Sequence, residues 1–172
     1  IVDELVAAAS DADVVYAVPG NPVVAERTVE SLRARDAAGT LGCALRVVPG
    51  LSFADLAWAH VGVDPLGGAR VVDARAFDVE SAGLYGPLLV AQCDTVLVLS
   101  DVKLALLEVL DAEHEVVALQ RLGLADEHVE RVALEDLDRV VAPDHLTSVF
   151  VDTGDAVIAG ELERLWQLTL RL

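Results

Sequence analysis

The sequence predicts an α/β protein whose first part is a doubly wound parallel sheet. Short β-branched runs of the kind buried in parallel sheets alternate with longer segments whose apolar residues recur at helical spacing. Two strand–turn–helix units follow one another early in the chain, and this succession is typical of a doubly wound sheet. The character of the sequence changes at residues 62–68, where we place a boundary between two lobes.

The first part begins with a helix over 1–9, which a polar break ends. The two units that follow each have a strand, a turn rich in proline and glycine, and a helix. The first unit has a strand over 14–18, the turn Pro19-Gly20-Asn21-Pro22 and a helix over 23–37. The second unit has a strand over 45–48, the turn Pro49-Gly50-Leu51-Ser52 and a helix over 53–61. We call the two turns the Pro19 turn and the Pro49 turn. Ser52 is expected to cap the last helix, with Asp55 close behind it, where a carboxylate suits the helix dipole.

Beyond the boundary, strands and helices continue to alternate. The expected elements are a strand over 69–73, a helix-to-strand unit over 88–99, a helix over 103–110, a strand over 115–119, a charged stretch over 126–139 and an edge strand over 147–151. A polar linker at 152–156 leads to an amphipathic helix that stops in mid-pattern at Leu172. Because the chain also opens at Ile1 and has no methionine, both ends are expected to be cut from a longer protein.

The composition argues against several classes of protein. The net charge is -17, and no cluster of basic residues offers the contacts that nucleic-acid phosphates need. An acidic surface also disfavours anionic membranes, and no run of about 18 apolar residues predicts a membrane span. No signal peptide leads the chain, so a cytoplasmic protein is expected.

The cysteines and histidines give no pattern of a metal or redox site. Cys43 and Cys93 lie far apart among apolar residues, and buried thiols are favoured over a disulfide. The four histidines lack the spacing of metal ligands and are expected at the surface or at edges: His60, His114, His128 and His145.

The Pro19 and Pro49 turns are the first candidate for a binding site. Ligands of open α/β sheets bind beyond the carboxyl ends of the strands, where glycine permits close approach and helix N-termini offer free N–H groups. Two ordinary tight turns are the alternative.

Two other candidates are weaker. Glu127, Glu130, Glu135 and Asp138 superficially form two carboxylate pairs of the kind that hold Mg²⁺ for pyrophosphate hydrolysis. The pairs are too close in sequence to lie on two facing helices, so a solvated charged face is favoured. Nucleophilic catalysis by Ser52 or Cys93 is disfavoured, because no histidine is singled out as its base.

Several motifs together resemble one family. Residues 15–29, around the Pro19 turn, resemble the second glycine motif of the tetrapyrrole (corrin/porphyrin) methylases, and more closely the YabN-like branch that is fused to MazG domains. Residues 48–53 and 57–62 resemble that family's next motif. Further matching segments are Val102-Lys103-Leu104, Gln120-Arg121-Leu122-Gly123, 134–139 and 145–150. The last helix resembles the opening helix of a MazG nucleoside-triphosphate pyrophosphohydrolase domain.

The resemblance implies a two-lobed methylase-like fold that binds S-adenosylmethionine between its lobes. Residues 1–66 would be an incomplete parallel first lobe, 67–151 a second lobe with a mixed sheet, and 152–172 a linker and the first MazG-like helix. The implied cofactor contacts are Pro19, Gly20, Asn21, Pro22, Gly50, Leu51, Ser52, Phe53, Gln92, Arg121, Leu122, Leu146, Thr147 and Ser148. No catalytic base is assigned, since positioning alone lowers much of the barrier to methyl transfer.

The implied activity is methyl transfer to a small-molecule acceptor, tetrapyrrole-like or otherwise, by a homodimer. The alternatives are a non-catalytic ligand-binding or dimerisation module of a pyrophosphohydrolase, and a hydrolase whose methylase chemistry is lost. The sequence departs from the family in three ways. The family's opening strand and glycine-rich loop would precede Ile1. Asn21 stands where many methylases carry Asp. The Mg²⁺ ligands of a MazG portion would follow Leu172.

Overall fold

The computed structural model describes residues 1–78, 80 and 86–153. The chain divides into two compact units between Asp55 and Leu56, within helix α3 (Phe53–Val61). The predicted limits of the lobes, 1–66 and 67–151, stay predictions. The amphipathic helix expected in the segment 152–172 lies outside the described residues.

The first unit contains helices α1 (Val2–Ala9) and α2 (Arg27–Ala37), both within the ranges that their apolar spacing predicted. α2 begins later than predicted because Glu26 caps it, with its carboxylate accepting the Thr28 N–H at 3.0 Å. The two helices are joined by an ion pair of 2.7 Å between Arg35 and Asp3.

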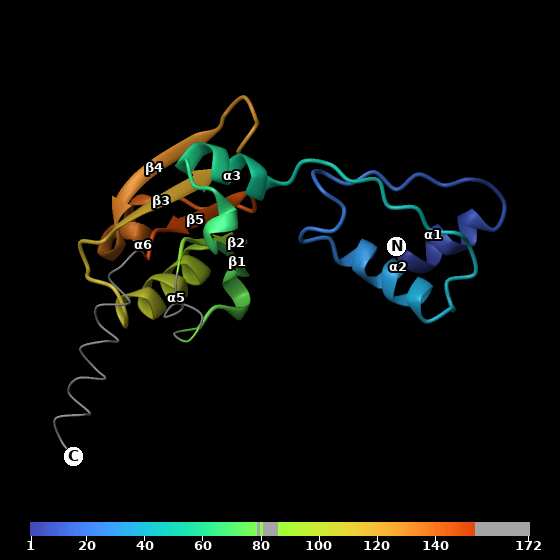
Figure 1. Cartoon of the computed structure of the whole chain (residues 1–172), viewed down its shortest axis with the longest axis horizontal. Helices are drawn as coiled ribbons and strands as arrows, with labels where there is room; N and C mark the ends of the chain where they lie inside the picture. Colours follow the sequence, from blue (N-terminus) through green and yellow to red (C-terminus); the bar gives the residue numbers. More distant parts are fainter. Residues whose placement is uncertain (79, 81–85, 154–172) are drawn as a thin grey trace, which may run out of the picture. The chain divides into compact units, whose positions relative to one another are not determined.

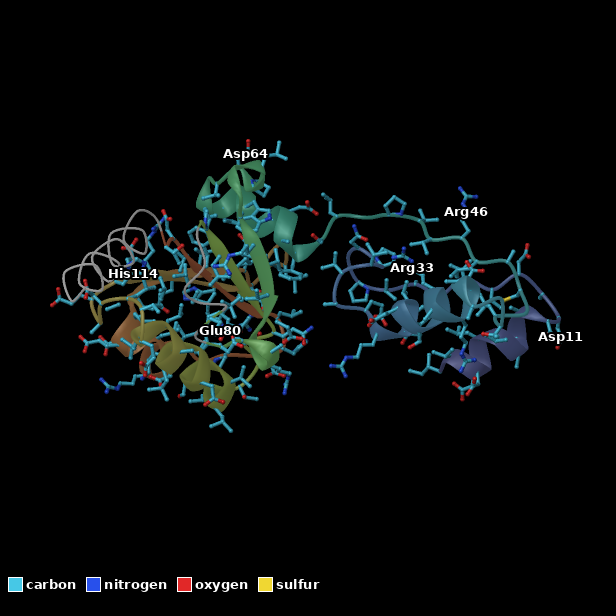
Figure 2. The ribbon with its side chains drawn as sticks, turned by 60° about the horizontal axis from the view of Figure 1, so that its bottom comes forward. Asp11, Arg33, Arg46, Asp64, Glu80 and His114 are labelled. Carbon is cyan, nitrogen blue, oxygen red and sulfur yellow. The ribbon has the colours of Figure 1, made fainter. Side chains whose placement is uncertain are left out.

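The strands predicted over 14–18 and 45–48 are not formed in the described structure. Val15 is 90% exposed and Val48 63%, although the pattern predicted buried strands. Arg46 also projects away from the ribbon (Figure 2). A strand exists only through its hydrogen-bonded partner. Within the described residues no ladder pairs either segment, so their β-branched composition alone does not produce a strand.

The second unit is built on a five-stranded mixed sheet (Figure 1). Its strands are β1 (Arg70–Asp73), β2 (Leu88–Ala91), β3 (Glu115–Gln120), β4 (His128–Ala133) and β5 (Thr147–Val151). The spatial order is β1-β2-β5-β3-β4, with β1 parallel to β2 and every other pair antiparallel. The mixed sheet of the second lobe is therefore confirmed.

Two predictions for this sheet were wrong, and one strand was missed. β5 was expected at an edge, yet it is the central strand and all its residues are buried. The unit over 88–99 has its strand first and its helix second, because α5 (Val96–Leu107) begins after Thr95, whose side chain accepts the Val98 N–H at 3.2 Å. β4 was missed because an edge strand exposes charged residues that hide its alternation.

Helices cover both faces of the sheet. On one face, α5, η3 (Leu134–Asp136) and α6 (Leu137–Val140) pack on alternate strand residues. The fully buried members of that core are Leu88, Val90, Cys93, Leu99, Val102, Leu106, Val116, Ala118, Leu134, Leu137, Val149 and Val151. On the other face, Trp58 of α3 meets Phe150 of β5 edge-on, with ring centroids 6.2 Å apart.

One charged cluster joins the helices on the first of these faces. Lys103 Nζ donates to Asp138 Oδ1 at 2.6 Å, and Ser100 Oγ donates to Asp138 Oδ2 at 2.6 Å. We call it the Lys103–Asp138 clasp. Its two charged side chains are 12% and 14% exposed. The expectation that Asp138 belongs to a solvated face was therefore wrong, because a single lysine reaches it between α5 and α6.

The remaining sequence predictions concern thiols and membranes. Both cysteines are free; Cys93 is buried as predicted, whereas Cys43 is only half-buried. Among the described helices, none combines the length and the apolarity that crossing a bilayer requires.

Candidate functional site

The Pro19 and Pro49 turns, predicted as cofactor contacts, lie against one another in the first unit. Gly20 has a φ of +80°, which favours glycine. A Cβ added to Gly50 would lie 3.0 Å from the Gly20 carbonyl oxygen, and one added to Gly20 would lie 3.4 Å from the Leu51 oxygen. The two glycines are thus required by the close approach of the turns, a role that the sequence did not specify.

Each turn is closed by its own polar side chain. Asn21 Oδ1 accepts the Val23 N–H at 3.1 Å, so the amide holds the Pro19 turn without a charge. In the Pro49 turn, Asp55 Oδ2 accepts the Ser52 N–H at 2.7 Å and the Ser52 hydroxyl at 2.9 Å. The Asp55 N–H donates to Ser52 Oγ at 3.4 Å, so Ser52 caps α3 as predicted. The Ser52 N–H and hydroxyl lower the pKa of Asp55. Leu51 remains 72% exposed, and Pro19, Pro22 and Phe53 are exposed or half-buried.

The other predicted contacts meet at one edge of the sheet in the second unit. β2 and β3 run parallel with β5 antiparallel between them, so the carboxyl ends of β2 and β3 share an edge with the start of β5. Gln92 follows β2, Arg121 follows β3, and Leu146 precedes β5. The Cys93 N–H donates to the Thr147 carbonyl at 3.0 Å, and the Arg121 N–H donates to the Leu146 carbonyl at 3.2 Å. We call this the β2–β5–β3 edge.

Two residues of this edge have left-handed backbones. Gln92 has a φ of 61° and Arg121 a φ of 52°, and each stands directly after its strand. Such a conformation costs a non-glycine residue about 1–3 kcal/mol and concentrates at functional sites. The left-handed backbone therefore distinguishes Gln92 and Arg121 from their neighbours, whereas the sequence singled them out only through the resemblance.

A polar network behind the edge was missed by the sequence analysis. Gln120 is buried and donates from Nε2 to the Ala142 carbonyl at 2.9 Å and to the Thr147 hydroxyl at 3.1 Å. Asp144 Oδ1 accepts the Leu146 N–H at 2.9 Å and the Thr147 hydroxyl at 3.1 Å. A buried glutamine at the end of a strand was the available signal, because a buried amide needs partners. The network fixes the backbone that leads into β5.

Charges at the edge are largely paired. The Arg121 guanidinium lies 3.5 Å from Asp144 and 3.3 Å from Asp126. Asp94, beyond the end of β2, pairs with Arg75. The half-buried side-chain amide of Gln92 makes no hydrogen bond within the described part of the chain. The edge therefore offers a free amide between neutralised charges, with no surplus of positive charge.

The weaker candidates do not gather into a site. Glu127 lies in a loop and Glu130 in β4, so they are not a pair on a helix. Within the ranges that the structure describes, no three potential metal ligands come together. Burial and the charges of Asp94 and Asp73 raise the pKa of the Cys93 thiol to about 12, which keeps it protonated and removes it as a nucleophile.

The mixed sheet, its edge and the two turns define a methylase fold, and the chain belongs to the tetrapyrrole (corrin/porphyrin) methylases, whose family model matches residues 1–138. Among its relatives is the uncharacterized protein YabN of Bacillus subtilis (strain 168), 38% identical over 151 residues. The alignment covers 88% of this chain and 30% of the relative, so the chain spans less than a third of that protein's length.

Solved structures share the fold. The uroporphyrin-III-C-methyltransferase from Thermus thermophilus is 28% identical, with a TM-score of 0.55 over 83% of this chain and 64% of that one. A structure of a Thermus thermophilus uroporphyrin-III C-methyltransferase complexed with S-adenosylhomocysteine is 17% identical, with a TM-score of 0.55 over 81% and 64%. The methyltransferase CobJ is 16% identical, with a TM-score of 0.61 over 78% and 62%. The chain thus spans less than two thirds of each of these structures.

Proposed function

We propose that this chain is the cofactor-binding part of an S-adenosylmethionine-dependent methyltransferase that acts on a small-molecule acceptor. The observation that carries the proposal is the β2–β5–β3 edge, where left-handed Gln92 and Arg121 flank the start of β5. Membership of the family supports it. So does the S-adenosylhomocysteine bound to one solved protein of the same fold.

The charges of the edge suit this ligand. S-adenosylmethionine carries a sulfonium cation beside an amino-acid group, and it has no phosphate. Arg121 is neutralised by two carboxylates, and the chain as a whole carries a net charge of -17. A polyphosphate would meet repulsion there, whereas a cationic ligand gains from the field.

The residues would act by holding and orienting the ligand. The Gln92 amide has capacity to hydrogen-bond a polar group, and Leu122 and Leu146 belong to the same edge, after β3 and before β5 respectively. The Thr147 hydroxyl is already committed to Gln120 and Asp144, so it stiffens the site and leaves the contact to its neighbours. When bound, S-adenosylmethionine supplies the methyl group; orientation of donor and acceptor is what the protein contributes, and no catalytic base is assigned.

Isothermal titration calorimetry of the full-length protein tests the proposal. We expect S-adenosylhomocysteine to bind with the same affinity in the presence and in the absence of excess ATP, which shares its adenosine but carries phosphates. Absence of heat with S-adenosylhomocysteine would overturn the proposal, as would displacement of S-adenosylhomocysteine by ATP.

A second proposal concerns the parent protein. The relative in Bacillus subtilis is more than three times as long as the segment aligned with this chain. We propose that the parent is MazG-type, with a Mg²⁺-dependent pyrophosphohydrolase portion, and that it is a cytoplasmic homodimer. In the non-catalytic form of this proposal, which the uncharged Asn21 favours, the chain only binds a ligand or dimerises. In that case, a variant of the parent protein that lacks this chain would differ from the parent in oligomeric state or in nucleotide hydrolysis. If it differed in neither, the non-catalytic form of the proposal would fail.

A further inference from the structure

The loop between β3 and β4, residues 121–127, carries two of the proposed cofactor contacts, Arg121 and Leu122. It is closed internally by N–H groups of Leu124 and Glu127, which donate to the carbonyls of Arg121 at 3.0 Å and Leu124 at 3.1 Å. No residue of the loop is buried, and Leu124 is 52% exposed. Apolar burial therefore does little to fix this loop, and its position must come from polar contacts.

Glu127 supplies such contacts with both of its carboxylate oxygens. Oε2 accepts the Gly123 N–H at 2.6 Å, and Oε1 lies 3.0 Å from Nε2 of His60 on α3. The two side chains are half-buried, at 29% and 35% exposed. Beside them the loop touches α3 directly, because a Cβ at Gly123 would lie 3.0 Å from Leu56 Cδ1. Glu127 thus bridges the loop to the helix at the point where they meet.

The contacts of Glu127 stabilise its ionised form. The Gly123 N–H and the neighbouring His60 together outweigh partial burial and lower the pKa of the Glu127 carboxyl. The carboxylate is therefore ionised at neutral pH, and charge-assisted hydrogen bonds are the stronger kind.

We infer that Glu127 is a positioning residue, which holds the 121–127 loop against α3 and so sets the backbone of Arg121 and Leu122 for the ligand. The inference rests on the proposed function. The sheet does not depend on this contact, since the β3–β4 ladder is complete from Gln120↔His128 onward. Loss of Glu127 should therefore change the loop and leave the fold intact.

Three variants of the full-length protein test this against a matched control. Glu127→Ala should weaken binding of S-adenosylhomocysteine about tenfold, within the range for residues that act without touching the ligand. Glu127→Gln keeps an acceptor for Gly123 but no charge for His60, and it should cost about threefold, as should His60→Gln. The control Glu130→Ala removes a carboxylate of the same hairpin whose only polar partner among the described residues is His128, and affinity should not change.

Two further measurements separate positioning from folding. The Tm of all four variants should stay within about 3 °C of the parent. Exchange of the Gly123 amide with solvent, followed by NMR, should accelerate in Glu127→Ala and not in Glu130→Ala.

The outcomes are distinct. Unchanged affinity in Glu127→Ala, or an equal loss in Glu130→Ala, overturns the inference. If Glu127→Ala unfolds the protein, Glu127→Gln decides by its affinity: a loss at unchanged Tm supports the inference, and no loss overturns it. If the unsubstituted protein binds no S-adenosylhomocysteine, the proposed function fails. Gly123 exchange then decides the bridge, and unaltered exchange in Glu127→Ala overturns it.

Discussion

Gln92 and Arg121 keep left-handed backbones without being glycine, and each stands where a strand ends beside β5. Two such residues at one edge are held by the surrounding bonds, since Cys93 and Arg121 both donate to the segment that starts β5. No sequence pattern encodes a positive φ at glutamine or arginine. The resemblance named these residues, but only the structure gives the physical reason for which they differ from their neighbours.

Glycine at position 50 leads to a prediction at the same scale. Gly50→Ala places a Cβ 3.0 Å from the backbone oxygen of Gly20, which has no rotamer to move aside. We expect a loss of about 1–3 kcal/mol in stability, measured by urea unfolding. Gly67→Ala is the control, because nothing lies within 4 Å of its added Cβ, and it should cost less than about 0.5 kcal/mol. Equal losses from both substitutions would mean that the two turns are not in contact.

At the scale of elements, the helices of the first 61 residues were better predicted than the strands of that segment. α1, α2 and α3 lie within or match their predicted ranges, because each helix makes its own hydrogen bonds and its caps are local. Segments 14–18 and 45–48 have the composition of strands and form none, since a strand depends on a neighbour that its own residues do not encode.

The Lys103–Asp138 clasp joins two elements and yields a second prediction. Lys103→Met keeps the length of the side chain but leaves the Asp138 carboxylate buried without its counter-charge. We expect a loss of about 1–3 kcal/mol in thermal or urea unfolding. Arg131→Met is the control, because its ion pair with Glu115 is 60% exposed on both sides and should contribute less than about 0.5 kcal/mol. A loss from Arg131→Met as large as that from Lys103→Met would contradict the argument.

The same clasp predicts how stability depends on pH. Burial alone would raise the pKa of Asp138, but the hydrogen bonds from Lys103 and Ser100 and the lysine charge outweigh it, so the pKa is lowered. A carboxyl whose folded pKa is depressed stabilises the protein above its unfolded pKa and loses that contribution as pH falls through the folded value. Asp138→Asn should therefore destabilise the protein at pH 7 and flatten the acid limb of Tm against pH. An acid limb as steep as in the unsubstituted chain would contradict this.

At the scale of the whole molecule, the sequence predicted the class and mixed sheet but not the strand order. β5 was expected at an edge although its residues 147–151 are all buried. Its composition, with Thr147 and Ser148 beside Val149, resembles that of a half-exposed strand. The burial of Thr147 is explained by two partners of its hydroxyl: the Gln120 amide donates to it from the end of β3, and Asp144, three residues upstream, accepts from it.

Hydrogen exchange across the chain tests this arrangement. In the 172-residue chain, β5 should hold the slowest amides, since it is bonded on both sides. The amides of 14–18 should be among the fastest, because no ladder holds them within the described residues. Mass spectrometry of peptic peptides would measure both, and protection of 14–18 comparable to that of β5 would show that this segment is paired.

The central place of β5 also determines when the sheet is completed during synthesis. A ribosome delivers β1 with β2, and then β3 with β4, as two neighbouring pairs whose inner sides are unfilled. Only when residues 147–151 emerge does one strand bond to β2 and β3 together. Until then, the nascent chain exposes two open strand edges that are prone to pair with other chains. The last strand of the sheet to be made is thus the one that closes it.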